Sequence, residues 1–265
     1  MKISLIITTY NWKEALAAVL ESVCRQTLLP DEIVIADDGS RSDTANLIAE
    51  YQKKLTVPLI HSWQEDQGFR VAMSRNRAFA KSSGDYIIMI DGDMVLSPKF
   101  IESYRQAVKK PGWFIQGGRV LANKECSDRI ILQGYQPSFF SRGIRNRKNC
   151  LSNHLLSKIF SFERNNAIST RSCNMGIWRS DLIEVNGFNN KFFGWGREDS
   201  EFVIRLLNAG KRRLYLKFAG VGYHLYHAES SKESLPENDR LLNLAISNKL
   251  ITCEDGLERF LTHEN

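Results

Sequence analysis

The sequence lacks the features that define several other classes of protein. No apolar run reaches the roughly 18 residues of a membrane-spanning helix, and the first residues enter a strand pattern without signal-peptide architecture. The five cysteines are scattered and include no Cys-x-x-Cys pair, which argues against a disulfide framework and against a zinc site. We therefore expect a cytoplasmic protein with reduced thiols.

Nucleic acid is not an expected partner, because no aromatic residues interleave the basic ones and no known binding motif is present. The net charge of +6 is instead concentrated between Arg142 and Arg171, where seven Lys and Arg accompany a single acid, Glu163. This basic window (residues 142–171) suits an acidic acceptor or peripheral contact with the anionic inner face of the plasma membrane. A solvated, mobile loop is the plainer alternative.

At 265 residues the chain is long enough for one large domain. Over residues 1–95, apolar runs of strand length alternate with segments of helical periodicity. The strands are expected at Ile3–Thr9, Ile33–Ala36, Val57–Ser62 and Tyr86–Ile90, and the helices near residues 16–23, 42–51 and 71–83. This series predicts an α/β fold with a mostly parallel, Rossmann-like central sheet flanked by helices.

Beyond Pro98 the pattern is less regular. It predicts a helix over Phe100–Val108, poor periodicity over 122–170, a helix over Ser200–Asn208 and a strand over Leu214–Phe218. We expect a single domain over residues 1–265, divided into a first half at 1–97, a second half at 98–230 and a polar helical tail at 231–265.

Polar side chains follow three of the predicted strands at the point where each strand ends. Thr8 and Thr9 end the first strand, Asp37 and Asp38 the second, and Asp91-Gly92-Asp93 the fourth. In open α/β sheets the ligand crevice lies beyond the carboxyl ends of the strands. The two aspartates around Gly92 therefore suit a divalent cation bound to a diphosphate, although Asp-Gly-Asp alone is also ordinary turn chemistry.

His224 and His227 lie three residues apart, so both imidazoles can face one point. Imidazole is the commonest transition-metal ligand; a pair of histidines satisfied in a surface turn is the alternative. Together with Asp93 the pair predicts a site with two nitrogen ligands and one oxygen ligand. The nitrogen ligands favour Mn²⁺ over Mg²⁺.

Glu198 and Asp199 stand at the start of a predicted helix and follow Gly194-Trp195-Gly196. Acids in a first helical turn often only complement the helix dipole. Here the glycines permit a mobile loop, and Trp195 offers a flat apolar face for a sugar ring. An acid beside such a platform can accept a hydroxyl proton.

Taken together, these motifs make the chain resemble a bacterial family 2 glycosyltransferase with the GT-A fold along essentially its whole length. In the first half the resemblance is carried by Thr8-Thr9-Tyr10-Asn11, Asp37-Asp38-Gly39-Ser40, Gly68-Phe69-Arg70, Arg75-Asn76 and Asp91-Gly92-Asp93. The second half is similar to the galactosyltransferase-type region shared by animal β-1,4-galactosyltransferases and bacterial chondroitin polymerases. That similarity is carried by Asn174-Met175, Asn186-Gly187-Phe188, residues 194–199 and the two histidines.

The resemblance implies a role for each matching residue on the donor side. Uracil and ribose would be held by Thr8, Tyr10, Asp37 and Asp38, and the nucleotide-sugar cleft would be lined by Arg70 and Asn76. Asp91 would face the ribose or the donor sugar. The same motifs also contribute Thr9, Asn11, Gly92 and Asn174 to the expected donor site.

On the metal and acceptor side, the resemblance implies that Asp93 and His227 bind the metal. His224 stands where the animal enzymes have methionine, and it completes the expected ligand set. Asp199 would be the catalytic base, with Glu198 and Trp195 contacting the acceptor. Arg197 stands where a glycine is usual in the animal enzymes, so the acceptor can differ.

The implied reaction transfers a hexose or an N-acetylhexosamine from a UDP-sugar to a hydroxyl of a glycan or glycolipid, with Mn²⁺ or Mg²⁺ and inversion, in surface polysaccharide or lipopolysaccharide biosynthesis. A nucleotidyltransferase would share the sheet and the metal acids, but it should carry a glycine- and lysine-rich phosphate loop, and residues 8–14 contain no glycine. The complete set of Asp93, Asp199 and His227 argues against a catalytically silent sugar- or membrane-binding module.

Overall fold

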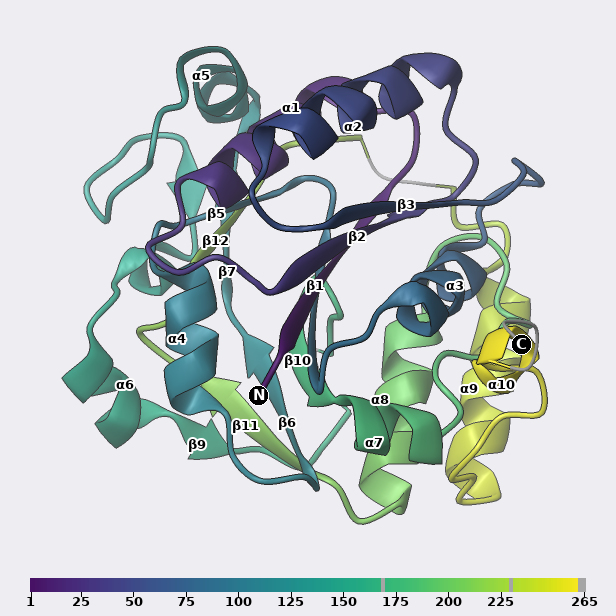
Figure 1. The fold of residues 1–265 in the computed structure, drawn as a ribbon. Helices are drawn as coiled ribbons and strands as arrows, with labels where there is room; N and C mark the ends of the chain where they lie inside the picture. Colours follow the sequence, from purple (N-terminus) through teal and green to yellow (C-terminus); the bar gives the residue numbers. More distant parts are fainter. Residues whose placement is uncertain (168–169, 229–230, 262–265) are drawn as a thin grey trace.

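A computed structural model describes residues 1–167, 170–228 and 231–261, and its centre is an eight-stranded sheet (Figure 1). The strand order is β3-β2-β1-β4-β10-β6-β11-β9. The first half of the chain supplies the parallel strands β1 (Ile3–Thr9), β2 (Glu32–Asp37), β3 (Leu59–Trp63) and β4 (Tyr86–Asp91). They are connected by α1 (Lys13–Cys24), α2 (Ser42–Lys54) and α3 (Val71–Lys81). The predicted parallel α/β series is confirmed.

The second half of the chain completes the sheet with strands of both directions. β10 (Asn174–Trp178) lies antiparallel between β4 and β6 (Trp113–Gly117). β11 (Arg212–Leu216) runs parallel to β6, and β9 (Phe162–Glu163) closes the edge. The helices of this half that flank the sheet are α4 (Phe100–Ala107), α7 (Arg179–Glu184) and α8 (Glu198–Asn208).

A second, four-stranded sheet has the order β5-β12-β7-β8. β5 (Met94–Leu96) begins directly after the turn that follows β4, and it pairs antiparallel with β12 (Gly222–His224). β7 (Arg119–Ala122) and β8 (Ile144–Arg145) complete this sheet. Strands of two to four residues carry no readable periodicity, which is why the sequence did not predict them.

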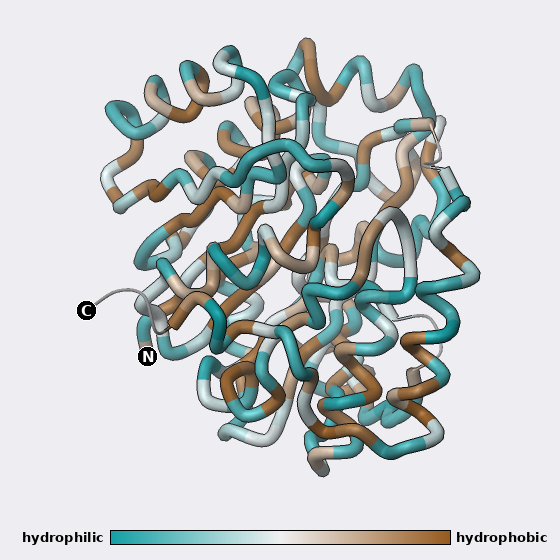
Figure 2. The backbone as a smooth tube through the Cα atoms, turned by 90° about the vertical axis from the view of Figure 1, so that its right-hand side faces the viewer, coloured by the Kyte–Doolittle hydropathy of each residue, from teal (hydrophilic) through white to brown (hydrophobic). Residues whose placement is uncertain are grey.

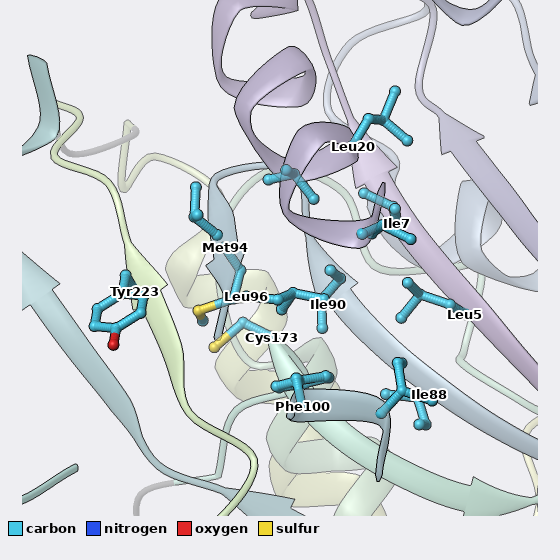
Figure 3. Close-up of a cluster of buried hydrophobic side chains, with 14 of the residues drawn as sticks. Leu5, Ile7, Leu20, Ile88, Ile90, Met94, Leu96, Phe100, Cys173 and Tyr223 are labelled. Atoms are coloured by element: carbon cyan, nitrogen blue, oxygen red, sulfur yellow. The ribbon is translucent and has the colours of Figure 1, made fainter. Parts of the chain in front are cut away.

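Both faces of the main sheet are covered by helices, because alternate residues of each central strand pack into different cores. Ile7 and Ile90 lie in the core under α1, α2 and α4, whereas Ile6 and Met89 lie in the core under α3, α7 and α8. Figure 3 shows strand residues of the first core together with Met94, Leu96 and Tyr223 of the small sheet. The small sheet is thus fixed to the same core as the strands of the first half.

The region over residues 122–170 has more regular structure than its weak periodicity suggests. It contains α5 (Lys124–Gln133), a 3₁₀ turn η1 (Arg147–Cys150) and α6 (His154–Phe160). The sequence does carry boundary signals for α5, since Asn123 accepts a hydrogen bond from the Cys126 amide and Gly134 ends the helix in the left-handed conformation. Residues 168–169 of the basic window lie outside the described residues.

The C-terminal segment is helical, as predicted, but it is more than a surface tail. α9 (Leu235–Ser247) packs against α8 and buries Leu241 and Ala245, and α10 (Glu258–Leu261) follows it. The last part of the predicted tail, residues 262–265, lies outside the described residues. Figure 2 shows hydrophilic and hydrophobic segments alternating along the helices, as expected for helices that rest one face on a core.

Among the described residues, no helix is long and apolar enough to cross a membrane.

Candidate active site

The carboxyl ends of β1, β2 and β4 meet at one edge of the sheet, as their sequence pattern predicts. Thr8 pairs in register with Asp91, and Thr9 pairs with Asp37. The Thr8 hydroxyl donates to Asp91 Oδ1 at 3.1 Å. Three strands therefore deliver polar side chains to the crevice in which α/β folds bind ligands.

Asp37 and Asp38 lie side by side at the end of β2 but differ in their partners. Asp37 is buried, accepts from the Ser40 amide at 2.7 Å and pairs with His61 Nε2 at 2.8 Å. Asp38 accepts from the Arg70 amide at 2.7 Å and from Gln64 at 2.6 Å. Burial nevertheless raises the pKa of Asp38 to about 6. Asp37 thus serves to shape the loop, and Asp38 links β2 to the start of α3.

The loop after β1 presents Tyr10 at the same edge. Tyr10 is 49% exposed, and its hydroxyl donates to Asp66 at 2.9 Å. Asn11 adopts a left-handed backbone with φ 47° and accepts from the Arg41 amide at 3.0 Å. The Arg70 guanidinium donates to the Glu65 carbonyl at 2.7 Å. Tyr10 thus presents an exposed aromatic ring beside a carboxylate at this edge of the sheet.

The turn between β4 and β5 brings its two aspartates into different surroundings. A Cβ atom on Gly92 would lie 2.4 Å from the Thr8 carbonyl oxygen, so only glycine lets the turn approach β1 this closely. Asp91 is one-third exposed, whereas Asp93 is nearly buried. Burial and the neighbouring charge of Asp91 raise the pKa of Asp93 well above its ordinary value.

The pairing of β12 with β5 places both histidines against Asp93. His224 lies opposite Met94 in the register, and the Leu225 amide donates to the Asp93 carbonyl at 2.9 Å. Asp93 Oδ2 then lies 3.5 Å from His224 Nε2 and 3.3 Å from His227 Nε2. One ligand atom from each of the three residues lies within 4.8 Å of the others.

The Nδ1 atoms of both histidines form hydrogen bonds with backbone carbonyl oxygens. His224 Nδ1 lies 2.8 Å from the Leu225 carbonyl oxygen, and His227 Nδ1 lies 2.7 Å from that of Ala228. These contacts assign the proton to Nδ1 and leave the Nε2 lone pairs directed at Asp93, as is typical of metal-ligating histidines. Burial and the charge of Arg119 lower the pKa of His224 to about 4, so this imidazole is neutral near pH 7.

Arg75 belongs to a motif that carries the resemblance, but the sequence assigned it no role. It projects from α3, is only 3% exposed, and lies over the Phe188 ring at 5.0 Å. Its guanidinium contacts Asp91 at 3.1 Å, Asp199 at 3.3 Å and Glu198 at 3.6 Å. One buried cation thus joins the acid at the end of β4 to the two acids at the start of α8.

Asp199 and Glu198 differ in how the protein holds them. Asp199 accepts from the Ser172 hydroxyl at 2.5 Å and from the Ser172 amide at 3.0 Å, in addition to its contact with Arg75. Glu198 is more deeply placed, and burial together with the charge of Asp199 raises its pKa to about 8. Three donated hydrogen bonds therefore fix the orientation of the Asp199 carboxylate, whereas Glu198 holds its proton near neutral pH.

The loop before these acids is held by α9. Asn238 donates to the Phe193 carbonyl at 3.0 Å, and Asp239 pairs with Arg197 Nε at 2.5 Å. Trp195 remains 43% exposed. Arg197 has φ 77°, a left-handed conformation that glycine adopts without cost.

Two residues expected in the donor site have structural roles instead. Asn76 is fully buried, donates to the Phe188 carbonyl at 2.7 Å and accepts from the Phe188 amide at 2.9 Å. Asn174 is 1% exposed, donates to the Gly118 and Gly220 carbonyls and accepts from Tyr104. Protein partners use the side-chain amides of both residues. Asn76 and Asn174 therefore fix the loops around the site and do not offer these amides to a ligand.

Arg119 is a second residue that the motifs did not show. It stands on β7, next to β12, and its charge lowers the pKa of His224. Its Nη1 atom lies 3.8 Å from Cys173 Sγ, and its buried Nε atom has no hydrogen-bond partner in the described part of the chain. A lone arginine in irregular sequence gives no signal; only the pairing of β7 with β12 brings it to the histidines.

Comparison with known proteins identifies the class to which this fold and site belong. The family model described as glycosyl transferase family 2 matches residues 4–176, so the chain belongs to that family. A second model, described as the N-terminal domain of galactosyltransferase, matches residues 153–228. The two models together cover every residue assembled above except those on α9.

Among curated relatives, the chain is 24% identical over 277 residues to chondroitin synthase of Escherichia coli, covering 94% of this chain and 38% of the relative. It is 33% identical over 224 residues to hyaluronan synthase of Pasteurella multocida, covering 78% of this chain and 23% of the relative. It is 26% identical over 216 residues to validoxylamine A glucosyltransferase of Streptomyces hygroscopicus subsp. limoneus, with 77% and 47% covered. The chain spans less than half the length of these relatives.

Solved structures confirm the GT-A fold. Residues 1–349 of S. aureus TarS in complex with UDP superpose with a TM-score of 0.63 at 18% sequence identity, covering 94% of this chain and 66% of that one. The complex of the same TarS fragment with UDP-GlcNAc gives a TM-score of 0.62 at 18% identity, covering 94% and 67%.

Proposed function

We propose that this chain is an inverting, metal-dependent glycosyltransferase that moves a hexose or an N-acetylhexosamine from a UDP-sugar to an acceptor hydroxyl. The observation that carries the proposal is the convergence of two clusters at one sheet edge. The first is the metal cluster, Asp93, His224 and His227, and the second is the acid cluster, Arg75, Asp91, Glu198 and Asp199.

The residues of the metal cluster fit a divalent cation. Asp93 Oδ1 is buried and has no hydrogen-bond partner in the described part of the chain, although it belongs to a carboxylate that prefers to be paired. Both Nε2 lone pairs point to the same region as that carboxylate. Mixed nitrogen and oxygen donors suit Mn²⁺, and Mg²⁺ is the alternative. When bound, the cation would offset the negative charge that develops on the departing diphosphate.

The donor nucleotide is proposed to lie along the ends of β1 and β2. Tyr10 offers a half-exposed ring for the base, and Asp38 offers a carboxylate for the ribose beside it. Thr8, Thr9, Asn11 and Arg70 shape this part of the crevice. TarS, which shares the fold, has been solved with UDP and with UDP-GlcNAc, and this supports a uridine nucleotide here.

The proton of the acceptor hydroxyl is proposed to pass to Asp199. A base must be ionised and correctly oriented when the acceptor arrives. Arg75 and Ser172 favour both conditions, because each donates to the Asp199 carboxylate. As the hydroxyl oxygen bonds to the anomeric carbon, the bond to the diphosphate oxygen breaks on the opposite face. A single displacement of this kind inverts an α-linked donor to a β-glycoside.

Glu198 and Trp195 are proposed to bind the acceptor. A carboxyl that retains its proton near neutral pH can donate a hydrogen bond to a sugar hydroxyl, and the exposed indole can stack on a sugar ring. In this assignment residues 1–97 hold the donor, residues 98–230 hold the metal and acceptor, and α9 fixes the acceptor loop.

The names of the relatives suggest a polymer or glycolipid as the acceptor. Two relatives are named chondroitin synthase and hyaluronan synthase, and we propose that this chain acts in surface polysaccharide or lipopolysaccharide biosynthesis. We place the reaction in the cytoplasm. The five free cysteines of the chain are compatible with a reducing compartment.

A donor panel tests this function. UDP release would be measured from UDP-Gal, UDP-GalNAc, UDP-Glc and UDP-GlcNAc with Mn²⁺, with Mg²⁺ and with a chelator, and a GDP-sugar would serve as the control. We expect release from one UDP-sugar that needs the cation, and a β-linked product by NMR. Release that is unaffected by the chelator would refute the metal assignment, and an α-linked product from an α-linked donor would refute inversion.

A further inference from the structure

Helix α6 presents apolar side chains to solvent and a polar side chain to the protein. Leu155 and Ile159 are 66% and 64% exposed, whereas Ser157 is only 7% exposed. The exposed apolar residues share one side of the helix and continue into the segments just before and just after it. This α6 face comprises Leu151, Leu155, Leu156, Ile159, Phe160 and Phe162. Soluble helices normally turn such residues inward, so the face is available to a partner.

The helix is fixed in this orientation at both of its ends. Before α6, the Asn153 amide donates to the Phe218 carbonyl at 2.8 Å, and the Asn153 side chain caps the helix through the Leu156 amide at 3.0 Å. After α6, the Lys217 amide donates to Ser161 Oγ at 3.0 Å. Phe160 also contacts the Phe218 ring edge-on at 5.6 Å. Helix α6 is therefore fixed at the periphery of the molecule (Figure 1), and the apolar side chains of the α6 face are exposed.

The surroundings of this face are positively charged. Lys158 lies on α6 itself and Lys148 lies on η1, shortly before Leu151; both are exposed, and neither forms an ion pair within the described residues. The single acid of the window, Glu163, is already paired with Arg212, through Nε at 2.7 Å. The cations around the apolar face thus lack a local counter-charge.

A groove beside α6 adds to this charge. It has a volume of about 580 Å³ and lies between α4, α6 and β11. Lys99, Lys109 and Lys158 line it together with His154, against one carboxylate, Glu102. The groove offers several cations and hydroxyls to an anionic headgroup at the edge of the apolar face.

We propose that α6 is an interfacial helix that docks this enzyme on an anionic lipid bilayer. A bilayer surface is the partner that combines an apolar layer with a flat negative charge, and this combination matches an apolar stripe flanked by lysines. The leucines, isoleucine and phenylalanines enter the boundary between headgroups and acyl chains. The lysines meet the phosphates around them. The inference does not depend on the proposed reaction.

Vesicle flotation with the whole chain tests the proposal. We expect binding to vesicles that contain phosphatidylglycerol, weaker binding to pure phosphatidylcholine, and loss of binding as salt is raised. The apolar variant is Leu155→Ser with Ile159→Ser, and its control is Ile183→Ser with Ile246→Ser, which are 45% and 48% exposed elsewhere. The affinity of the α6 variant for the vesicles should fall by roughly tenfold or more, and the control should bind as the wild type does.

A charge pair separates electrostatics from apolar insertion. Lys148→Glu with Lys158→Glu should weaken binding to anionic vesicles by roughly tenfold or more, since each basic residue near the surface contributes about a fivefold factor. Lys53→Glu with Lys81→Glu, on α2 and α3, is the matched control and should bind normally. Far-UV circular dichroism and the rate of UDP release should be unchanged in all four variants.

Three outcomes would overturn the proposal. The first is equal binding to neutral and anionic vesicles, and the second is an absence of binding to both. The third is a dimer, seen by analytical ultracentrifugation, that Leu155→Ser with Ile159→Ser dissociates while vesicle binding is absent. In that case a second copy of the chain, and not a membrane, covers the α6 face.

Discussion

Residues 1–97 and residues 98–261 contribute to the same site in different ways. In the first part each site residue follows the strand that carries it, so Thr8, Asp38 and Asp91 meet because parallel strands end at one edge. In the second part His224 reaches Asp93 only because the three-residue strands β5 and β12 pair across a long sequence separation. The first part is thus specified by local pattern, whereas the second depends on tertiary pairing.

The two parts of the site should therefore respond differently to substitution. Groups fixed by the parallel sheet sit on strands buried on both faces, and a single substitution there removes one contact. Groups of the second part are held by a few long-range contacts, such as Arg75 with Asp199 and Asn238 with the Phe193 carbonyl. Changes at these links should alter chemistry or acceptor binding while leaving the donor half intact.

The largest effect is expected at the base. Asp199→Asn keeps the shape but replaces one of the two acceptor oxygens that face Ser172 by an NH₂ group. It cannot take up a proton, so transfer should fall by roughly 10²–10⁴-fold. Binding of the UDP-sugar, measured by calorimetry, should stay close to that of the wild type. Glu198→Gln is the matched control and should raise the acceptor KM more than it lowers kcat. Near-normal transfer by a folded Asp199→Asn protein would place the base elsewhere, with Glu198 as the first candidate.

The next largest effect is expected at the link between the two parts. Arg75→Lys keeps the charge but cannot contact Asp91, Glu198 and Asp199 together. Misplacement of the acids should lower kcat by about 10- to 100-fold. Arg77→Lys, two residues along α3 and stacked on Phe260 at 5.4 Å, is the control. If both variants lower kcat equally, Arg75 has no special role in the site.

A smaller effect is expected where α9 holds the acceptor loop. Asn238→Ala removes the donor to the Phe193 carbonyl. This loss should destabilise the ordered conformation of the loop by about 1–3 kcal/mol. The acceptor KM should rise severalfold while the donor KM is unchanged. Asn208→Ala removes a comparable bond between α8 and the segment after α9, to the Leu250 carbonyl at 2.8 Å, and should leave both KM values unchanged. A parallel rise in the donor KM would mean that α9 supports the whole fold and not the acceptor side.

The smallest effect concerns pH and Glu198. Folding raises the pKa of this carboxyl from 4.5 to about 8, so the folded chain binds the proton more tightly than the unfolded chain. Stability should therefore fall as pH rises from about 4.5 to about 8. Each kcal/mol of stability that is lost corresponds to a Tm decrease of roughly 2–4 °C.

Glu198→Gln removes this titration and should flatten the decline in Tm, measured by calorimetry with a chelator present. Glu237→Gln, at a fully exposed acid on α9, is the control and should keep the wild-type slope. Identical slopes for the wild type and Glu198→Gln would show that the buried carboxyl is ionised throughout.

The fold and the strand-end residues could be predicted from the sequence because their signals are local. The apolar run before Asp91 identifies a buried strand, and its end identifies the sheet edge. Arg75 could not be assigned, since nothing in its motif shows that α3 directs it toward α8. Asn76 and Asn174 were expected to contact the ligand, but a motif does not show which polar group is consumed by protein partners.

Asp93, His224 and His227 are proposed to hold a divalent cation that binds the donor diphosphate. Calorimetric titration of UDP, with Mn²⁺ and with a chelator, tests this role in the wild type, in Asp93→Ala and His227→Ala, and in His154→Ala as an exposed-histidine control. We predict that Mn²⁺ strengthens UDP binding in the wild type and in His154→Ala, and that this gain is lost in Asp93→Ala and His227→Ala. An undiminished gain in folded Asp93→Ala and His227→Ala proteins would show that these residues do not hold the cation.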